Sequence, residues 1–139
     1  MPFINDFIIE PIGEQTFILK EDLKYSNSLL EITVKKDFDF DGASIPRYLW
    51  SIVGSPMTGG YQRSACMHDA LYSSNILPKD MCDSLFLEAM ISDGVSSLLA
   101  YTMYYAVRFG GNSAYKDTDP IKYSKFITIG YINGIKTKA

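Results

Sequence analysis

The chain contains one histidine, His68, and the residues around it are of types that can do chemistry. Asp69 follows it directly, and Tyr72 lies about one helical turn further on. A histidine whose ring is oriented by a carboxylate can act near neutral pH as a general base towards water. The alternative is a buried histidine whose polar contacts only fix the register of two helices, and the residues alone leave both open.

The stretch around His68 has the periodicity of an amphipathic helix. At ~100° per residue, Tyr61, Ala65, His68 and Tyr72 fall within about 60° of one another and form its inward stripe. Asp69 lies on the flank of that stripe, where it can reach solvent or a loop. His68 is therefore predicted to lie in the interior, with Asp69 directed elsewhere.

Asp83 is the predicted partner of the His68 ring. It lies on the inward stripe of the following helix, which is predicted to start at Pro78. A buried carboxylate is costly unless it is paired. A short turn at 73–77 joins the two helices, so they should pack antiparallel and bring Asp83 level with His68. We expect a hydrogen bond between the two side chains.

An acidic loop, residues 37–46, precedes a short helix expected at about 46–52. The carboxylates of Asp69 and Asp41, with backbone carbonyls near Gly42, would form an oxygen-only set of ligands. Such a set suits Ca²⁺ rather than zinc. The alternative for this loop is a solvated acidic turn that holds no metal.

The order of the expected elements favours an α+β fold in a single domain, 1–139. Residues 1–36 alternate short β-rich runs with polar breaks and predict a small antiparallel sheet. Residues 37–111 hold the acidic loop and a bundle of three main helices. The tail, 112–139, contains the string FITIGYI, which predicts a last strand or an assembly arm that contacts a neighbouring molecule.

The third of these helices, at about 95–109, is apolar nearly all round and predicts a central helix or an interface helix. Its apolar run of about 15 residues is shorter than the ~20 needed to cross a bilayer, so we expect no transmembrane segment. Arg108, near its end, could favour the helix dipole or neutralise one of the inward aspartates.

Composition excludes some classes of function. The 139 residues carry a net charge of −3 and the basic residues are scattered, which argues against a nucleic-acid partner. Cys66 and Cys82 cannot staple a domain of this size and are expected to be free, buried thiols. No basic segment followed by an apolar run opens the chain, so we expect synthesis in a cytosol.

Several strings at compatible spacing resemble a phage and prophage family known only as domain of unknown function 1353. They are FDGASIPRYLW at 40–50, GYQRSACMHDALY at 60–72, DSLFLEAMISDGV at 83–95 and MYYAVRFGG at 103–111. The resemblance implies a protein made in the cytoplasm of a bacterial host and a role among virion, lysis or host-takeover proteins. Assembly into the phage virion, with other virion proteins or with further copies of the chain, is one expectation.

A more distant resemblance suggests chemistry. The string of His68, Asp69 and Tyr72, with Asp83 on the following helix, is similar to the active-site helix pair of phospholipase A2, especially its bacterial and fungal forms. The resemblance implies that His68 activates water, that Asp83 orients its ring and that Tyr72 hydrogen-bonds to Asp83.

The same resemblance extends to the metal. Asp41-Gly42-Ala43-Ser44 is similar to the Asp-Gly-Cys-Ser loop of those enzymes, with Ala43 in place of the cysteine. It implies that Asp69 and Asp41 hold Ca²⁺ against the ester carbonyl. The cysteines that lock the two helices in phospholipase A2 have no clear counterpart in this chain.

Two functions follow as expectations. The first is a Ca²⁺-assisted ester hydrolase that acts on phospholipid at the bacterial envelope. The second is a non-enzymatic virion structural or accessory protein in which the His/Asp network is structural. Hydrolysis of another bond is a third alternative, although a single histidine leaves too few ligands for the usual zinc sites of such enzymes.

Overall fold

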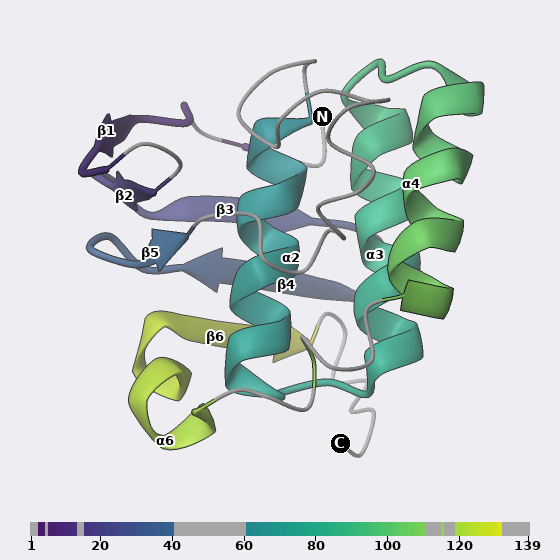
Figure 1. The fold of residues 1–139 in the computed structure, drawn as a ribbon. Coiled ribbons are helices and arrows are strands. Elements are labelled where there is room, and N and C mark those ends of the chain that lie inside the picture. The colour runs from purple at the N-terminus through teal and green to yellow at the C-terminus, as the bar shows by residue number, and fades with distance from the viewer. Residues whose placement is uncertain are drawn as a thin grey trace.

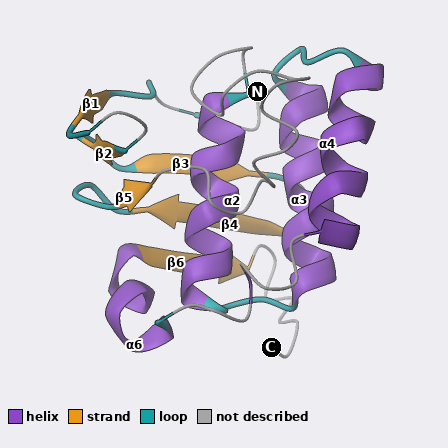
Figure 2. Ribbon diagram, in the orientation of Figure 1, coloured by secondary structure: helices purple, strands orange, loops and turns teal. Residues whose placement is uncertain are grey.

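The computed structural model describes residues 3–4, 6–13, 16–40, 61–110, 115 and 119–131. It has an α+β fold, as the sequence predicts, with two small antiparallel sheets beside a set of helices (Figures 1 and 2). Residues 41–46 of the expected acidic loop, and the short helix expected at about 46–52, lie outside the described residues.

The strands form two three-stranded sheets. The first has the order β1-β2-β5, with β1 at Ile9–Pro11, β2 at Phe17–Leu19 and β5 at Asp39–Phe40. The second has the order β3-β4-β6, with β3 at Leu23–Ser26, β4 at Leu30–Val34 and β6 at Ile127–Tyr131. All the pairings between these strands are antiparallel.

The central strand β4 follows the predicted alternation. Leu30, Ile32 and Val34 are buried and Glu31 is exposed, so one face of the sheet packs on the core. Strand β6 pairs with β4 along its whole length, from Val34 opposite Ile127 to Leu30 opposite Tyr131. Of the two alternatives for the FITIGYI string, the structure therefore has the last strand.

Three helices follow the predicted bounds closely. They are α2 at Gln62–Ser74, α3 at Lys79–Ser92 and α4 at Ser97–Gly110, and a short helix α6 at Pro120–Tyr123 precedes β6. In Figure 1, α2 crosses the face of the sheet β3-β4-β6. Helix α3 packs beside α2, and α4 packs on the far side of α3. Because α2 is covered by the sheet and by α3, it is buried almost all round.

An ion pair fixes the start of α2 against the end of α3. The guanidinium of Arg63 donates to both carboxylate oxygens of Asp93 at 2.6 Å, and it lies 4.7 Å from the centre of the Phe3 ring. The Asp93 side chain is 5% exposed, so the two-point contact is largely shielded from water. It fixes the two helices at the end remote from their connecting turn.

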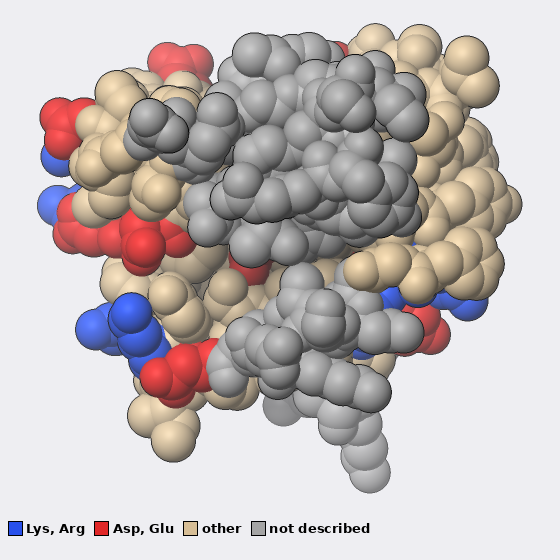
Figure 3. Space-filling view, in the orientation of Figure 1, with Lys and Arg blue, Asp and Glu red and all other residues tan. Residues whose placement is uncertain are grey.

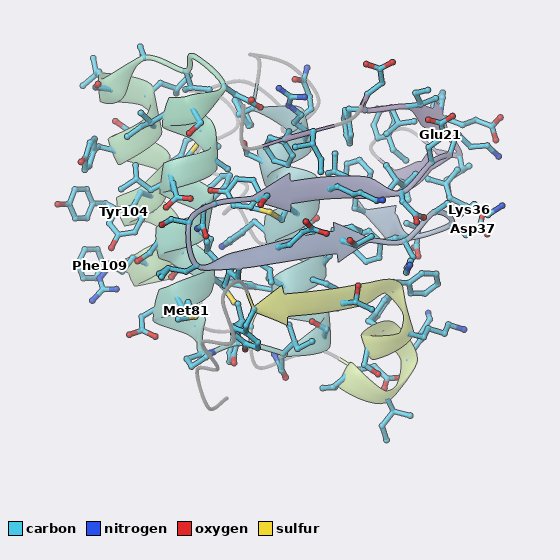
Figure 4. The ribbon with its side chains drawn as sticks, turned by 180° about the vertical axis from the view of Figure 1, so that it is seen from behind. Glu21, Lys36, Asp37, Met81, Tyr104 and Phe109 are labelled. Carbon is cyan, nitrogen blue, oxygen red and sulfur yellow. The ribbon has the colours of Figure 1, made fainter. Side chains whose placement is uncertain are left out.

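Of the two alternatives for this helix, central or interface, the structure excludes the first, because α4 is not central. It packs on α3 through a single stripe, and its buried residues are Ala100, Met103 and Val107. Figure 4 shows Tyr104 and Phe109 directed away from the rest of the molecule. The apolar composition of this helix therefore exceeds what its packing within the chain requires.

Gly94, just after α3, provides a test of backbone strain. Its φ is +85°, and a Cβ added there meets no atom within 4 Å. The cost of Gly94→Ala is therefore purely conformational, and we expect unfolding free energy to fall by about 1–2 kcal/mol in urea titrations. Gly130→Ala is the matched control, because Gly130 has equal space and no positive φ. An equal loss in both variants would contradict this account.

Candidate active site

His68 lies in the middle of α2 and has no exposed surface. Its ring stacks on Phe86, with the ring centres 4.6 Å apart, and the Tyr72 ring lies 4.1 Å away on its own helix. The predicted interior position is therefore confirmed. Aromatic side chains from α2 and α3 hold the imidazole in one orientation.

The predicted contact between His68 and Asp83 is present. Nε2 of His68 lies 2.8 Å from Oδ1 of Asp83, and the Tyr72 hydroxyl donates to the same oxygen at 2.5 Å. Asp83 is fully buried, so both contacts form away from water. The structure thus brings together the three residues expected in the catalytic group, two from α2 and one from α3.

Lys79 completes this cluster and was missed by the sequence analysis. Its ammonium donates to Oδ2 of Asp83 at 2.8 Å and also to the carbonyl oxygens of Val107 and Arg108, at 2.9 and 3.0 Å. The cation that neutralises Asp83 is therefore Lys79 and not Arg108. The available signal was the spacing of four residues between Lys79 and Asp83, which places both on one helix face.

The environment of His68 and Asp83 lowers the pKa of both side chains. Burial lowers the pKa of His68 below its ordinary 6.5, and the Lys79 charge adds to this effect, although Asp83 opposes it. Burial alone would raise the pKa of Asp83, but hydrogen bonds from His68, Lys79 and Tyr72 outweigh it and lower that pKa. At neutral pH the cluster contains a neutral imidazole and a carboxylate paired with an ammonium.

These charge states fix the tautomer of His68. An ionised carboxylate can only accept hydrogen bonds, so Nε2 carries the ring proton and donates it to Asp83. Nδ1 then carries the lone pair and is the basic nitrogen. Burial and Asp83 raise the pKa of Tyr72, so its phenol stays protonated as a donor. This arrangement is what a histidine general base requires.

The residues predicted to bind Ca²⁺ are placed only in part. Asp69 is on α2 and is 6% exposed, so it does not extend into solvent. Asp41 and Gly42 lie outside the described residues. Within the described part of the chain, no three His, Cys, Asp or Glu side chains are grouped as a metal site. Because Asp41 and Gly42 are among the residues that the structure does not describe, calcium binding stays a prediction.

Both cysteines are free and buried, as expected. Cys66 is on α2 and Cys82 on α3, where its thiol donates to the Leu77 carbonyl at 3.6 Å. Burial raises the pKa of both thiols, so they are protonated and unreactive at neutral pH. The two cysteines form no disulfide. Near His68, α2 is held against α3 by the hydrogen bonds of Asp83.

Residues 17–107 match the model of a protein family, whose description is protein of unknown function (DUF1353). The chain belongs to this family. The match confirms the first of the two resemblances noted from the sequence and covers all the residues of the His68 cluster. The family description names no reaction or ligand, so chemistry has to be inferred from the site itself.

Two relatives come from Sinorhizobium fredii (strain NBRC 101917 / NGR234). The uncharacterized protein y4jT is 36% identical over 67 residues, which are 48% of this chain and 20% of the relative. The uncharacterized protein y4iH is 35% identical over 72 residues, which are 52% of this chain and 30% of the relative. The matches thus span less than a third of either relative. No solved structure matches this chain significantly.

None of the helices in the described ranges is long and apolar enough to cross a membrane, in agreement with the expectation from the sequence. The phage source, the virion partners and the likeness to phospholipase A2 stay predictions.

The buried neutral histidine predicts how stability depends on pH. The unfolded chain binds a proton on His68 near pH 6.5, whereas the folded chain resists it, so stability should fall as pH drops below about 6.5. The limiting slope is about 1.4 kcal/mol per pH unit. Urea titrations between about pH 7 and 5 measure it, and His68→Gln should flatten this region. A slope that persists in His68→Gln would contradict the assignment, because no other histidine is present.

Removing the cation should raise the pKa of His68. In Lys79→Met the Asp83 carboxylate loses its ammonium, so the imidazole takes up a proton more readily, and stability falls by about 3–5 kcal/mol. NMR titration of the single histidine measures the first effect and chemical denaturation the second. Lys122→Met is the control, because Lys122 is exposed and packs on Tyr123. An unchanged pKa in folded Lys79→Met would show that Lys79 does not set the charge of the ring.

Proposed function

We propose that this protein is a hydrolase in which His68, oriented by Asp83, activates water to cleave an ester bond, with phospholipid as the substrate class. The observation that carries the proposal is the contact between Nε2 and Oδ1 at 2.8 Å. Since the proton-bearing Nε2 donates to Asp83, Nδ1 is the nitrogen that carries the lone pair. The substrate class rests on the similarity of the His-Asp-x-x-Tyr string to phospholipase A2.

The proposed step is a proton transfer coupled to addition of water. Nδ1 of His68 takes a proton from water while the water oxygen bonds to the ester carbonyl carbon, giving a tetrahedral intermediate. The imidazolium then returns this proton to the leaving alcohol oxygen as the carbon–oxygen bond breaks. The products are a carboxylic acid and an alcohol. Asp83 stabilises the transient imidazolium, and Tyr72 holds the carboxylate in position.

A second candidate is the non-enzymatic virion structural or accessory protein. The observation that favours it is the burial of His68, whose side chain has no exposed surface, because a reacting group must meet water and substrate. In this case the cluster would hold α2 and α3 in register. Only the first candidate, the hydrolase, would require calcium. An assay of ester hydrolysis in calcium and in chelator therefore tests both candidates.

Release of fatty acid from phospholipid vesicles tests the hydrolase. We expect release by the native chain and a loss of about 10³-fold in kcat/KM for His68→Gln. The rate should rise with pH and level off above the pKa of His68, which lies below 6.5. Absence of release in both calcium and chelator, or equal release by His68→Gln, would reject the proposal in favour of the structural role.

Two phenol deletions separate catalysis from folding. Tyr72→Phe removes the hydroxyl that donates to Asp83, whereas Tyr115→Phe removes one that donates to the Leu77 carbonyl at 2.9 Å. The two rings contact each other, with their centres 5.3 Å apart, so the two hydroxyls lie in the same part of the molecule. We expect a loss of about 10-fold in kcat/KM and a shifted pH profile for Tyr72→Phe alone. Equal effects in the two variants would mean that the hydroxyl only supports the fold.

A further inference from the structure

Helix α4 carries a continuous apolar surface, which we call the α4 stripe. It consists of Leu98, Tyr101, Tyr105 and Phe109, whose exposed fractions are 82%, 45%, 51% and 74%. The Tyr105 ring lies 6.3 Å from that of Tyr101 and 6.0 Å from that of Phe109, which is nearly parallel to it. The rings therefore form a row along the helix rather than isolated exposed side chains.

The composition of α4 is that of an interface core. Arg108 is its only charged residue, and it has no acidic one. In Figure 3 the edge of the molecule over α4 is free of acidic and basic side chains for most of its length. Interface cores are enriched in Tyr and Phe and depleted in charged residues, whereas exposed helix faces of monomers are mainly polar.

We propose that the α4 stripe is a homodimer interface, in which α4 packs antiparallel on α4 of a second copy across a two-fold axis. The spacing of the stripe fits this arrangement. When Leu98 faces the partner's Phe109, Tyr101 faces the partner's Ala106 and Tyr105 faces the partner's Thr102. Each tyrosine ring of the stripe then meets a small residue, and Leu98 packs on Phe109, as knobs meet holes in packed helices.

The same register keeps like charges apart. The two Arg108 side chains lie at opposite ends of the helix pair, on either side of the axis. A symmetric contact brings the same surface of both copies together, so a face with a central charge would repel itself. The α4 stripe has no such charge.

The area available supports a reversible dimer. A fully buried aromatic side chain contributes ~150–250 Å², so the exposed parts of the stripe come to roughly 500 Å² per copy. Two copies would bury about 1,000 Å² in total, which is the lower limit for a specific interface. A bilayer is the less suitable occupant, because helices that lie on anionic lipid carry flanking Lys and Arg, and the chain has a net charge of −3.

Sedimentation of the full chain over a range of concentrations tests the interface. We expect a monomer–dimer equilibrium and a dissociation constant raised at least 30-fold in Tyr105→Glu. Ile121→Glu is the matched control, because Ile121 is 92% exposed on α6 and should leave the equilibrium unchanged. A chain that is monomeric at every concentration, or a dimer that persists in folded Tyr105→Glu, would overturn the proposal.

Thiol cross-linking tests the orientation. Thr102 lies near the proposed axis, so Thr102→Cys should give a covalent dimer with a short bis-maleimide, whereas Thr128→Cys on the exposed face of β6 should not. Cys66 and Cys82 are buried and contribute no background. Equal cross-linking of both variants would reject the α4 contact. Binding of monomer to phosphatidylglycerol vesicles that is lost in Tyr105→Glu would instead assign the stripe to lipid. Neither test depends on whether the chain is a hydrolase.

Discussion

The carboxylate of Asp83 is the constraint on which the helical part of this fold depends. It is ionised and fully buried, so it requires donors at both oxygens. His68 and Tyr72 supply two from α2 and Lys79 supplies one from α3. Lys79 also donates to carbonyl oxygens in the last turn of α4. The helix dipole favours a cation at that end of the helix. One carboxylate therefore sets the positions of three helices at the same level.

The sequence predicted the position of His68 well because burial determined it. An apolar stripe with helical periodicity has to face the core, and a short turn between two such helices makes them antiparallel. Together these place Asp83 opposite His68 without any knowledge of the loops. The alternation in β4 worked in the same way, because one face of that sheet is covered and the other is not.

The role of Lys79 was missed, and the exposed face of α4 was left open between two alternatives, for related reasons. A lysine in the first turn of a helix is usually a solvated residue, and only the packing of α4 brings carbonyl acceptors to its ammonium. Nothing in the α4 sequence says which apolar residues face α3 and which face outward, since nearly all of them are apolar. The predicted calcium ligands Asp41 and Gly42 fall in an expected loop, where the periodicity of the sequence gives no position.

Lys79 also affects the charge state of His68, which matters for both the structural and the catalytic role of the cluster. If Asp83 served only to hold two helices in register, a protonated His68 could neutralise it within one ion pair. The ring is instead neutral, because burial lowers the pKa of His68 and the Lys79 charge adds to this effect, and the positive charge beside Asp83 comes from Lys79. A neutral imidazole costs less to bury than an imidazolium, so it suits a packing role, and it is also the form that accepts a proton from water. Lys79 thus allows a neutral His68 to lie beside an ionised Asp83, an arrangement that either a structural cluster or a base catalyst would use.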